Sequence, residues 1–289
     1  MKELTVTTAS YQREEIPALG NRFLTGNGYL GVRGTLEEYG AQQLAAVTLA
    51  GIYDRHGAGW REPPNAPNPF ALCLYRGSAA LALPEAEVRR HVQTLDARRG
   101  LHRRDTVFAD GTELAVERFA HMRQVHLLAL RARVTAPEAG EYRLEAAVDG
   151  DVWDINGPHY RTMALETREG LNAALAVTNE NDRVAVCARY GLDVTHARTD
   201  RTQGRRRIAS FTFRLAAGET ATLEIVAAVY TGKDCADPAA AAFRAAREAD
   251  GYDALRADHI ACWEALWARA DVEISGDPDA ETALNYSAY

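Results

Sequence analysis

The sequence lacks the patterns that mark several common classes of protein. Its four cysteines are scattered, with no Cys-x-x-Cys pair and no Cys/His cluster, so we predict neither a disulfide framework nor a zinc site. No stretch approaches the roughly 18 uninterrupted apolar residues of a membrane helix, and the opening MKELTVTTASYQREE has no signal-peptide core. We therefore predict free thiols, a cytoplasmic location and no association with a membrane.

Other absences concern charge and catalytic motifs. The net charge of −7 argues against a nucleic-acid partner. The eight histidines include no His-x-His or His-x-x-x-His pair, so no metal site is predicted, and there is no Gly-x-Ser-x-Gly. These patterns assign no catalytic residue.

A glycine-rich segment, Gly26–Gly31, matches the Gly-x-Gly-x-x-Gly of dinucleotide-binding proteins, and Asp54 lies roughly where a ribose-binding acid is expected. That motif needs a buried strand before it, whereas Pro17 and Gly20 occupy this place. The segment therefore predicts a tight turn, and no cofactor is expected.

Apolar and polar residues alternate from residue 112 to 231, which indicates repeated half-buried strands. In EYRLEAAV, for example, Tyr142, Leu144, Ala146 and Val148 share one face. Because helical crossovers are lacking, we predict antiparallel sheets in a sandwich or barrel. For residues 20–110, rich in glycine and proline, we predict short strands and long loops.

The composition changes after Lys233, where an alanine-rich stretch predicts helices. Asp237-Pro238 predicts a helix start and Gly251 a break. Trp263 and Leu266 fall on one apolar stripe with Trp267 beside it, which predicts that both tryptophans pack against the sheets. We predict a sandwich over 1–233, a helical linker with a returning strand over 234–276, and the start of a further domain over 277–289.

Clustered charges have ordinary structural interpretations. Paired carboxylates cleave glycosidic bonds when they lie roughly 5–10 Å apart, but we interpret the set at 149–154 as a tight connection and the set at 277–281 as the first turn of a helix. The basic run Arg98–Arg104 predicts a solvated or salt-bridged surface, with binding of a phosphate or of an acidic neighbouring domain as the alternatives. The carboxylates considered are Glu37/Glu38, Asp149/Asp151/Asp154 and Asp277/Asp279/Glu281.

Several segments, in this order, resemble the N-terminal part of glycoside hydrolase family 65, which includes maltose, trehalose and kojibiose phosphorylases and some trehalases. NRFLTGNGYLGVRGTLEE resembles the opening Gly-Asn-Gly-Tyr motif of the family, and TLDARRGLHRR resembles a later Leu-Asp-x-Arg-x-Gly segment, with His102 replacing an apolar residue. The other similar segments are AGIYD, ERFAHMRQVHLLALR, DGDVWDINGPHY and HIACWEALWARADVEISGDPDAETALNYSAY.

The resemblance implies a mainly β fold: a large antiparallel β-sandwich of the galactose mutarotase type, a helical linker, and an (α/α)6 catalytic barrel that is absent apart from its start at 277–289. It further implies a parent enzyme that cleaves α-glucosidic disaccharides with inversion, by phosphorolysis or hydrolysis. The general-acid glutamate and the phosphate-binding loop of the family belong to the barrel, so no catalytic residue is carried over. Inorganic phosphate is then a co-substrate of the parent enzyme. The implied partners are the barrel, the disaccharide and a second copy in a homodimer.

In the related enzymes a sandwich loop abuts the barrel near the sugar pocket. We therefore predict that Asn27, Tyr29 and Arg33, the polar residues of the glycine-rich segment, form a rim of the substrate pocket. The alternative is an internal turn.

Two other functions remain open at this point. A stand-alone carbohydrate-binding module would use Trp60 or Trp153 to stack on a sugar. A mutarotase-like epimerase would need a histidine acid and a carboxylate base, for which His121, His126 and His159 are the candidates.

Overall fold

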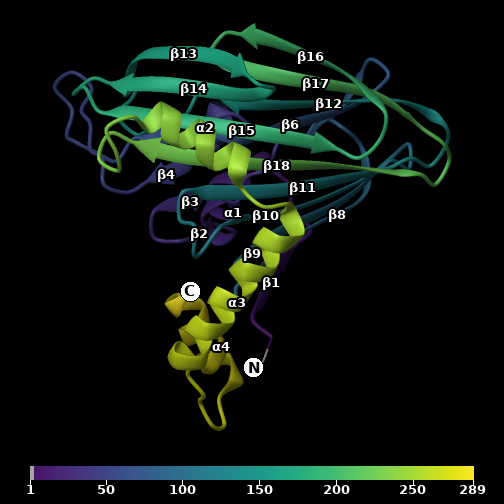
Figure 1. The fold of residues 1–289 in the computed structure, drawn as a ribbon. Helices are drawn as coiled ribbons and strands as arrows, with labels where there is room; N and C mark the ends of the chain where they lie inside the picture. The colour runs from purple at the N-terminus through teal and green to yellow at the C-terminus, as the bar shows by residue number, and fades with distance from the viewer. Residues whose placement is uncertain (1–2) are drawn as a thin grey trace.

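A computed structural model describes residues 3–289 and has two large antiparallel sheets packed face to face (Figure 1). The larger sheet has nine strands in the order β1-β8-β9-β10-β11-β18-β15-β14-β13. The strands of this sheet are β1 Thr5–Thr8, β8 Val88–Asp96, β9 Leu101–Phe108, β10 Glu113–Ala120, β11 Leu127–Thr135, β13 Tyr160–Arg168, β14 Leu171–Thr178, β15 Arg183–Leu192 and β18 Thr220–Thr231.

The second sheet has five strands in the order β16-β17-β12-β6-β7. Its strands are β6 Asn68–Arg76, β7 Ala79–Leu81, β12 Gly140–Asp149, β16 His196–Gln203 and β17 Arg206–Leu215. The core lies between the sheets, where Leu128 and Leu130 of β11 share one cluster with Tyr142 and Leu144 of β12. The alternating pattern of residues 112–231 therefore gave the correct fold class.

Residues 20–110 differ from the prediction of short strands and long loops. Short strands do form a third sheet, β2 (Thr25–Gly26), β3 (Leu30–Val32), β4 (Val47–Leu49) and β5 (Asn65–Ala66), after the helix α1 (Ile16–Arg22). However, β6, β8 and β9 are full-length strands of 8–9 residues. Their inward pattern was hidden because several buried side chains on β8 and β9 are polar, among them Gln93, His102 and Arg104.

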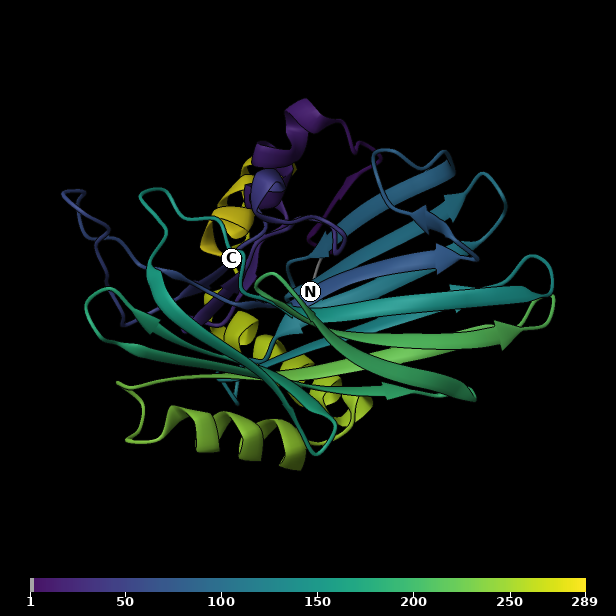
Figure 2. The ribbon, with the colours of Figure 1, turned by 90° about the horizontal axis from the view of Figure 1, so that it is seen from above.

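Helix α2 and the first turns of α3 cover part of the outer face of the larger sheet. α2 (Pro238–Glu248) begins at Asp237, whose side chain accepts a hydrogen bond from Ala240 N at 3.0 Å, as the Asp-Pro pair predicted. Figure 2 shows α2 lying beneath the sheet, where its residues pack on β14, β15 and β18. None of the helices described in residues 3–289 has both the length and the apolar character needed to cross a membrane.

α3 (Tyr252–Ala270) starts at Gly251 and runs away from the sheets (Figure 1). Its tryptophans are buried as predicted, and Trp267 Nε1 donates to Ala97 O at 3.1 Å. The buried stripe follows positions 255, 259, 263 and 267, whereas Leu266, which was predicted to lie on it, is 42% exposed.

The predicted returning strand at residues 271–276 is wrong, because this segment pairs with no strand. Side chains of the last helix, α4 (Pro278–Ala288), satisfy its backbone instead. Asn285 accepts from Val272 N at 3.1 Å and donates to Val272 O at 2.8 Å, and Glu281 accepts from Ile274 N at 3.0 Å. These bonds replace the ladder that a strand would need.

The turn between β8 and β9 depends on Gly100. Its φ is +59°, and a Cβ at this position would collide with the indole of Trp263. We expect Gly100→Ala to lower the free energy of unfolding by about 1–3 kcal/mol more than Gly77→Ala. Gly77 is the matched control because its φ is +58° with no atom within 4 Å of the added Cβ. If urea denaturation shows the same loss of unfolding free energy for both variants, α3 shifts to accommodate the added methyl group without cost.

Candidate functional site

The glycine-rich segment forms the turn between β2 and β3, with Gly28 at φ +86°. The Asn27 amide donates to His121 O and Val125 O, both at 2.9 Å. Its oxygen accepts from the backbone N–H groups of residues 29 and 30 at 2.9 and 2.7 Å. Asn27 thus fastens the turn to the segment before β11.

The other two predicted rim residues bind elsewhere in the chain. Tyr29 donates to Asp234 Oδ2 at 2.5 Å. Arg33 donates to Asn21 Oδ1 at 2.6 Å and Pro17 O at 2.7 Å. All three side chains are half-buried, and each holds a different segment rather than converging on one point.

Just beyond this segment, two motif glutamates meet two arginines in a buried ionic cluster. Arg104 donates to Glu38 through both terminal nitrogens, with Nη2–Oε1 at 2.9 Å, and its Nη1 lies 3.3 Å from Glu37 Oε2. Arg118 donates to Glu37 Oε1 at 2.6 Å and to Thr35 O at 2.6 Å. This cluster joins the 33–39 segment to strands β9 and β10.

The burial of this cluster corrects the surface interpretation of residues 98–104 at Arg104, whereas Arg99 and Arg103 are exposed as predicted. The side chain of Arg104 is 0% exposed, with Glu37 at 1% and Glu38 at 5%. Burial alone would lower the pKa of Arg104, but the two carboxylates outweigh it and raise the pKa, so the charge is retained. Glu37 and Glu38 therefore form ion pairs with guanidinium groups and are not placed to act on a glycosidic bond.

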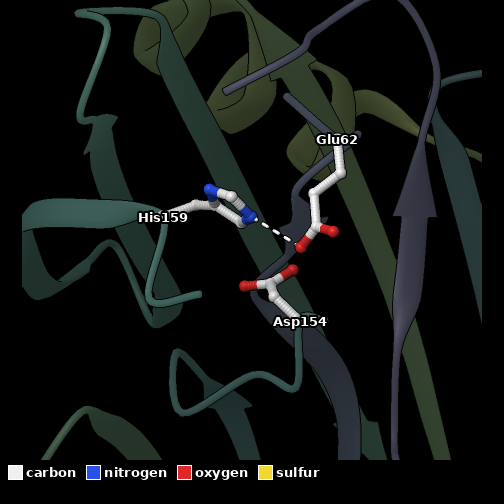
Figure 3. A group of neighbouring side chains, drawn as sticks. All are labelled: Glu62, Asp154 and His159. Atoms are coloured by element: carbon white, nitrogen blue, oxygen red, sulfur yellow. Dashed lines mark hydrogen bonds and ion pairs between the residues drawn. The ribbon is translucent and has the colours of Figure 1, made fainter. Parts of the chain in front are cut away.

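A second buried cluster joins two loops around His159, the β4–β5 loop with Asp54 and Glu62 and the β12–β13 loop with Asp154 (Figure 3). His159 Nδ1 lies 2.9 Å from Asp54 Oδ2, and Nε2 lies 2.9 Å from Glu62 Oε1. Asp154 faces the same point and accepts from Asn65 N at 2.9 Å. His159 and Asp54 are fully buried, and Glu62 is 6% exposed.

The geometry makes His159 an imidazolium. An ionised carboxylate only accepts hydrogen bonds, so both ring nitrogens must carry a proton. Burial alone would lower the pKa of His159, but the hydrogen bonds to Glu62 and Asp54 raise it. Burial raises the pKa of Asp154 to about 6, with the nearby charge of Glu62 adding to the rise.

These residues could also be considered as metal ligands, since ligand atoms of Glu62, Asp154 and His159 lie within 4.8 Å of one another. A histidine must be deprotonated to bind a metal. A metal would thus have to displace the proton that joins His159 to Glu62. The cluster as described fits a histidine cation held by carboxylates.

The sequence did not predict this cluster. The sequence patterns offer Asp54 only as a ribose-binding acid and His159 only as the acid of an epimerase, and they single out no role for Glu62. The two loops meet where His159 contacts Asp54 and Glu62, and where the Asn156 N–H donates to Glu62 at 2.7 Å. No spacing pattern reports contacts between loops about a hundred residues apart.

The residues of the alternative functions are dispersed. His121 accepts from Gln124 N at 2.9 Å, and His126 stacks on Tyr230 with ring centroids 3.9 Å apart, so neither joins His159. Trp60 is 63% exposed, as a sugar-stacking residue would be, whereas Trp153 is half-buried, with the guanidinium of Arg33 at 5.7 Å from its ring centroid. The interpretation of residues 149–154 as a tight connection fits Asp149, which accepts from Asp151 N at 2.9 Å.

The fold is a β-sandwich domain followed by helices. Glu37 and Glu38 of the glycine-rich motif segment form ion pairs that hold this segment to the larger sheet. The family model for the N-terminal domain of glycosyl hydrolase family 65 matches residues 6–266. The chain therefore belongs to this family, as the resemblance of its segments indicated.

The curated relatives are longer proteins. The nigerose phosphorylase of Lachnoclostridium phytofermentans is 35% identical over 99% of this chain and 42% of its own length. The 1,2-alpha-glucosylglycerol phosphorylase of Bacillus selenitireducens is 26% identical over 96% of this chain and 37% of its own. The chain thus spans about two-fifths of the length of these relatives.

A solved structure shows the same fold. A human-microbiome protein provisionally named as a kojibiose phosphorylase superposes with a TM-score of 0.87 at 15% identity. The match covers 98% of this chain and 40% of that chain. This agreement extends through the sheets and the helices that follow them.

Proposed function

We propose that the chain is the non-catalytic N-terminal domain of an enzyme that cleaves an α-glucosidic disaccharide with inversion, by phosphorolysis or hydrolysis. The observation that carries the proposal is the match to the family's N-terminal domain together with the coverage of only 42% of the nigerose phosphorylase. Catalysis would belong to an (α/α)6 barrel, with residues 277–289 as its first part and phosphate as co-substrate. The sandwich would support this barrel within a homodimer in the cytoplasm.

The charged clusters support a non-catalytic role. Inverting glycoside cleavage needs a carboxylic acid at the leaving oxygen and a nucleophile on the opposite face of the sugar. Glu37 is enclosed by two arginines, and Glu62 is occupied by His159. Neither carboxylate is placed to meet a substrate in the described residues.

We expect the 289-residue chain to be folded and inert. Incubation with nigerose, kojibiose, maltose or trehalose plus phosphate should release neither glucose nor glucose 1-phosphate, as measured by coupled assay. Sustained turnover by the purified chain would overturn the proposal. Calorimetric titration with the same sugars tests the alternative of a carbohydrate-binding module, for which Trp60→Ala would abolish binding.

We further propose that Asn27, Tyr29 and Arg33 contribute to the rim of the substrate pocket in the longer enzyme. Their half-buried side chains leave part of each residue open to a neighbouring domain. Tyr29→Phe and Arg33→Ala are expected to raise KM in the longer enzyme. Because the two substitutions also remove the hydrogen bonds to Asp234 and Asn21, we expect a moderate fall in the melting temperature of the 289-residue chain as well. A loss of stability in the isolated chain, with KM unchanged, would assign these residues to the internal turn.

A further inference from the structure

A cavity of about 280 Å³ lies on the outer face of the nine-stranded sheet, where the cover of helices stops. Along β11 the outward residues Leu127 and Ala129 pack under α2 and α3. The next outward residues, Arg131 and Arg133, line the cavity instead. The first turns of α3 complete the wall with Arg256.

A small side chain, Ala115, forms the floor of the cavity, and arginines form its walls. Ala115 on β10 lies opposite Arg133 of β11 in the strand register. Glu117 on the same strand lies between Arg103 of β9 and Arg131 of β11. Because Ala115 ends at Cβ, its long neighbours surround a hollow.

Two of the four arginines are held by ion pairs. Arg256 Nε donates to Glu117 Oε1 at 2.5 Å. Arg131 Nη1 pairs with Asp253 Oδ1 at 2.7 Å, and its Nη2 pairs with Glu224 Oε1 at 2.6 Å. These pairs fix the guanidinium groups at the cavity wall.

The other two arginines are not matched in this way. Arg103 has its ion-pair partner, Asp105, at 3.8 Å. Within the described part of the chain, Arg133 has no carboxylate within 4.0 Å. Both side chains are exposed and line the cavity from β9 and β11, on either side of β10. The cavity lining therefore holds four arginines but only two carboxylates, Glu117 and Asp253.

The carboxylate of Asp253 is an anion that the arginines of the cavity already stabilise. The hydrogen bond from Arg131 lowers the pKa of the Asp253 carboxyl, and the charges of Arg131, Arg133 and Arg256 lower it further. Its side chain is 81% exposed, so it can leave the cavity without disturbing the core. The carboxylate therefore occupies a place that a stronger anion can take.

We propose that this cavity binds a small oxyanion bearing a phosphoryl group, held by Arg103, Arg131 and Arg133 after displacement of Asp253. Guanidinium groups match phosphate oxygens in geometry and charge. The volume is below the roughly 300–1,000 Å³ typical for drug-sized ligands, as suits a small anion. The first turns of α3 contribute the side chains of Asp253 and Arg256 to the cavity lining.

The test is isothermal titration of the 289-residue chain at constant ionic strength, with inorganic phosphate in one arm and glucose 1-phosphate in the other. Saturable binding in either arm is expected, and tighter binding in the second arm identifies a sugar phosphate as the source of the group. Arg133→Gln should weaken binding by about tenfold or more. Arg214→Gln is the matched control, because this arginine is 78% exposed on the other sheet.

Two further variants separate a built site from general attraction. Ala115→Leu keeps every charge but fills the floor, and it should abolish binding. Asp253→Asn removes the internal competitor and should strengthen binding severalfold. The proposal would be overturned if the unmodified chain shows no saturable binding. It would also be overturned if the Arg133→Gln and Ala115→Leu variants bind as tightly as the unmodified chain. Neither result depends on the activity of the longer enzyme.

Discussion

Replacing Arg104 with methionine is expected to lower the free energy of unfolding by about 3–5 kcal/mol, because it leaves buried Glu38 without a cation and Glu37 with Arg118 alone. Glu37 and Glu38 are 1% and 5% exposed, so water cannot solvate them in its place. Urea denaturation followed by circular dichroism measures the loss. Arg103→Met is the matched control: Arg103 is the preceding residue, points to the opposite face and is exposed, so we expect a change within about 0.5 kcal/mol.

A double variant tests the electrostatic cause. Arg104→Met combined with Glu38→Gln removes one unpaired charge together with the guanidinium and should recover part of the loss. If the double variant is less stable by the full sum of the two single losses, the cluster stabilises the fold through packing of the long side chains and not through charge.

Replacing His159 with phenylalanine is expected to cost about 3–5 kcal/mol near pH 6 while keeping the ring volume. The variant leaves Asp54 and Glu62 buried with no cation between them. His196→Phe is the control, because His196 is exposed and its ring forms a hydrogen bond with Val194 O at 2.8 Å. Equal unfolding midpoints for the His159 variant and the unmodified chain would contradict the role of the imidazolium.

The pH dependence has a definite sign. The pKa of His159 is raised in the folded protein, so its contribution is complete below the unfolded value of about 6.5 and is lost as pH rises through the folded value. Burial raises the pKa values of Asp54 and Glu62, but hydrogen bonds from Glu180, Asn156 and His159 lower them overall. Their contribution is therefore present above about pH 4 and lost in acid. The stability difference between the unmodified chain and the variant should be largest between about pH 4.5 and 6.5.

The sequence predicted those parts of the molecule whose burial follows a simple period. Tyr142 and Leu144 of β12 alternate with polar neighbours, and Trp263 and Trp267 of α3 recur at helical spacing, so both faces could be assigned in advance. Where inward residues are charged, the same reasoning failed. Arg104 resembled a surface residue because its burial depends on glutamates 66 and 67 residues away in sequence.

The loop cluster around His159 was beyond prediction for a related reason. Asp54, Glu62 and His159 occupy irregular segments, and His159 lies 105 and 97 residues from Asp54 and Glu62 in sequence. Only the tertiary fold brings the segments together. The segment at 271–276 failed differently, because Val272 and Ile274 alternate as a strand does while α4 supplies the hydrogen bonds.

The position of β11 in the centre of the larger sheet has a consequence for synthesis of the chain. Strands β8 to β11 are consecutive hairpins and can pair as they leave the ribosome, but β11 meets its other neighbour, β18, only after β12 to β17 have been made. Until then β11 is an open edge with unpaired backbone groups and apolar residues such as Leu128 and Leu130 uncovered. Aggregation during expression should therefore be greatest for chains truncated before Thr220. Slowing translation beyond that residue should have the smallest effect on aggregation, because β18 can then cover the edge of β11.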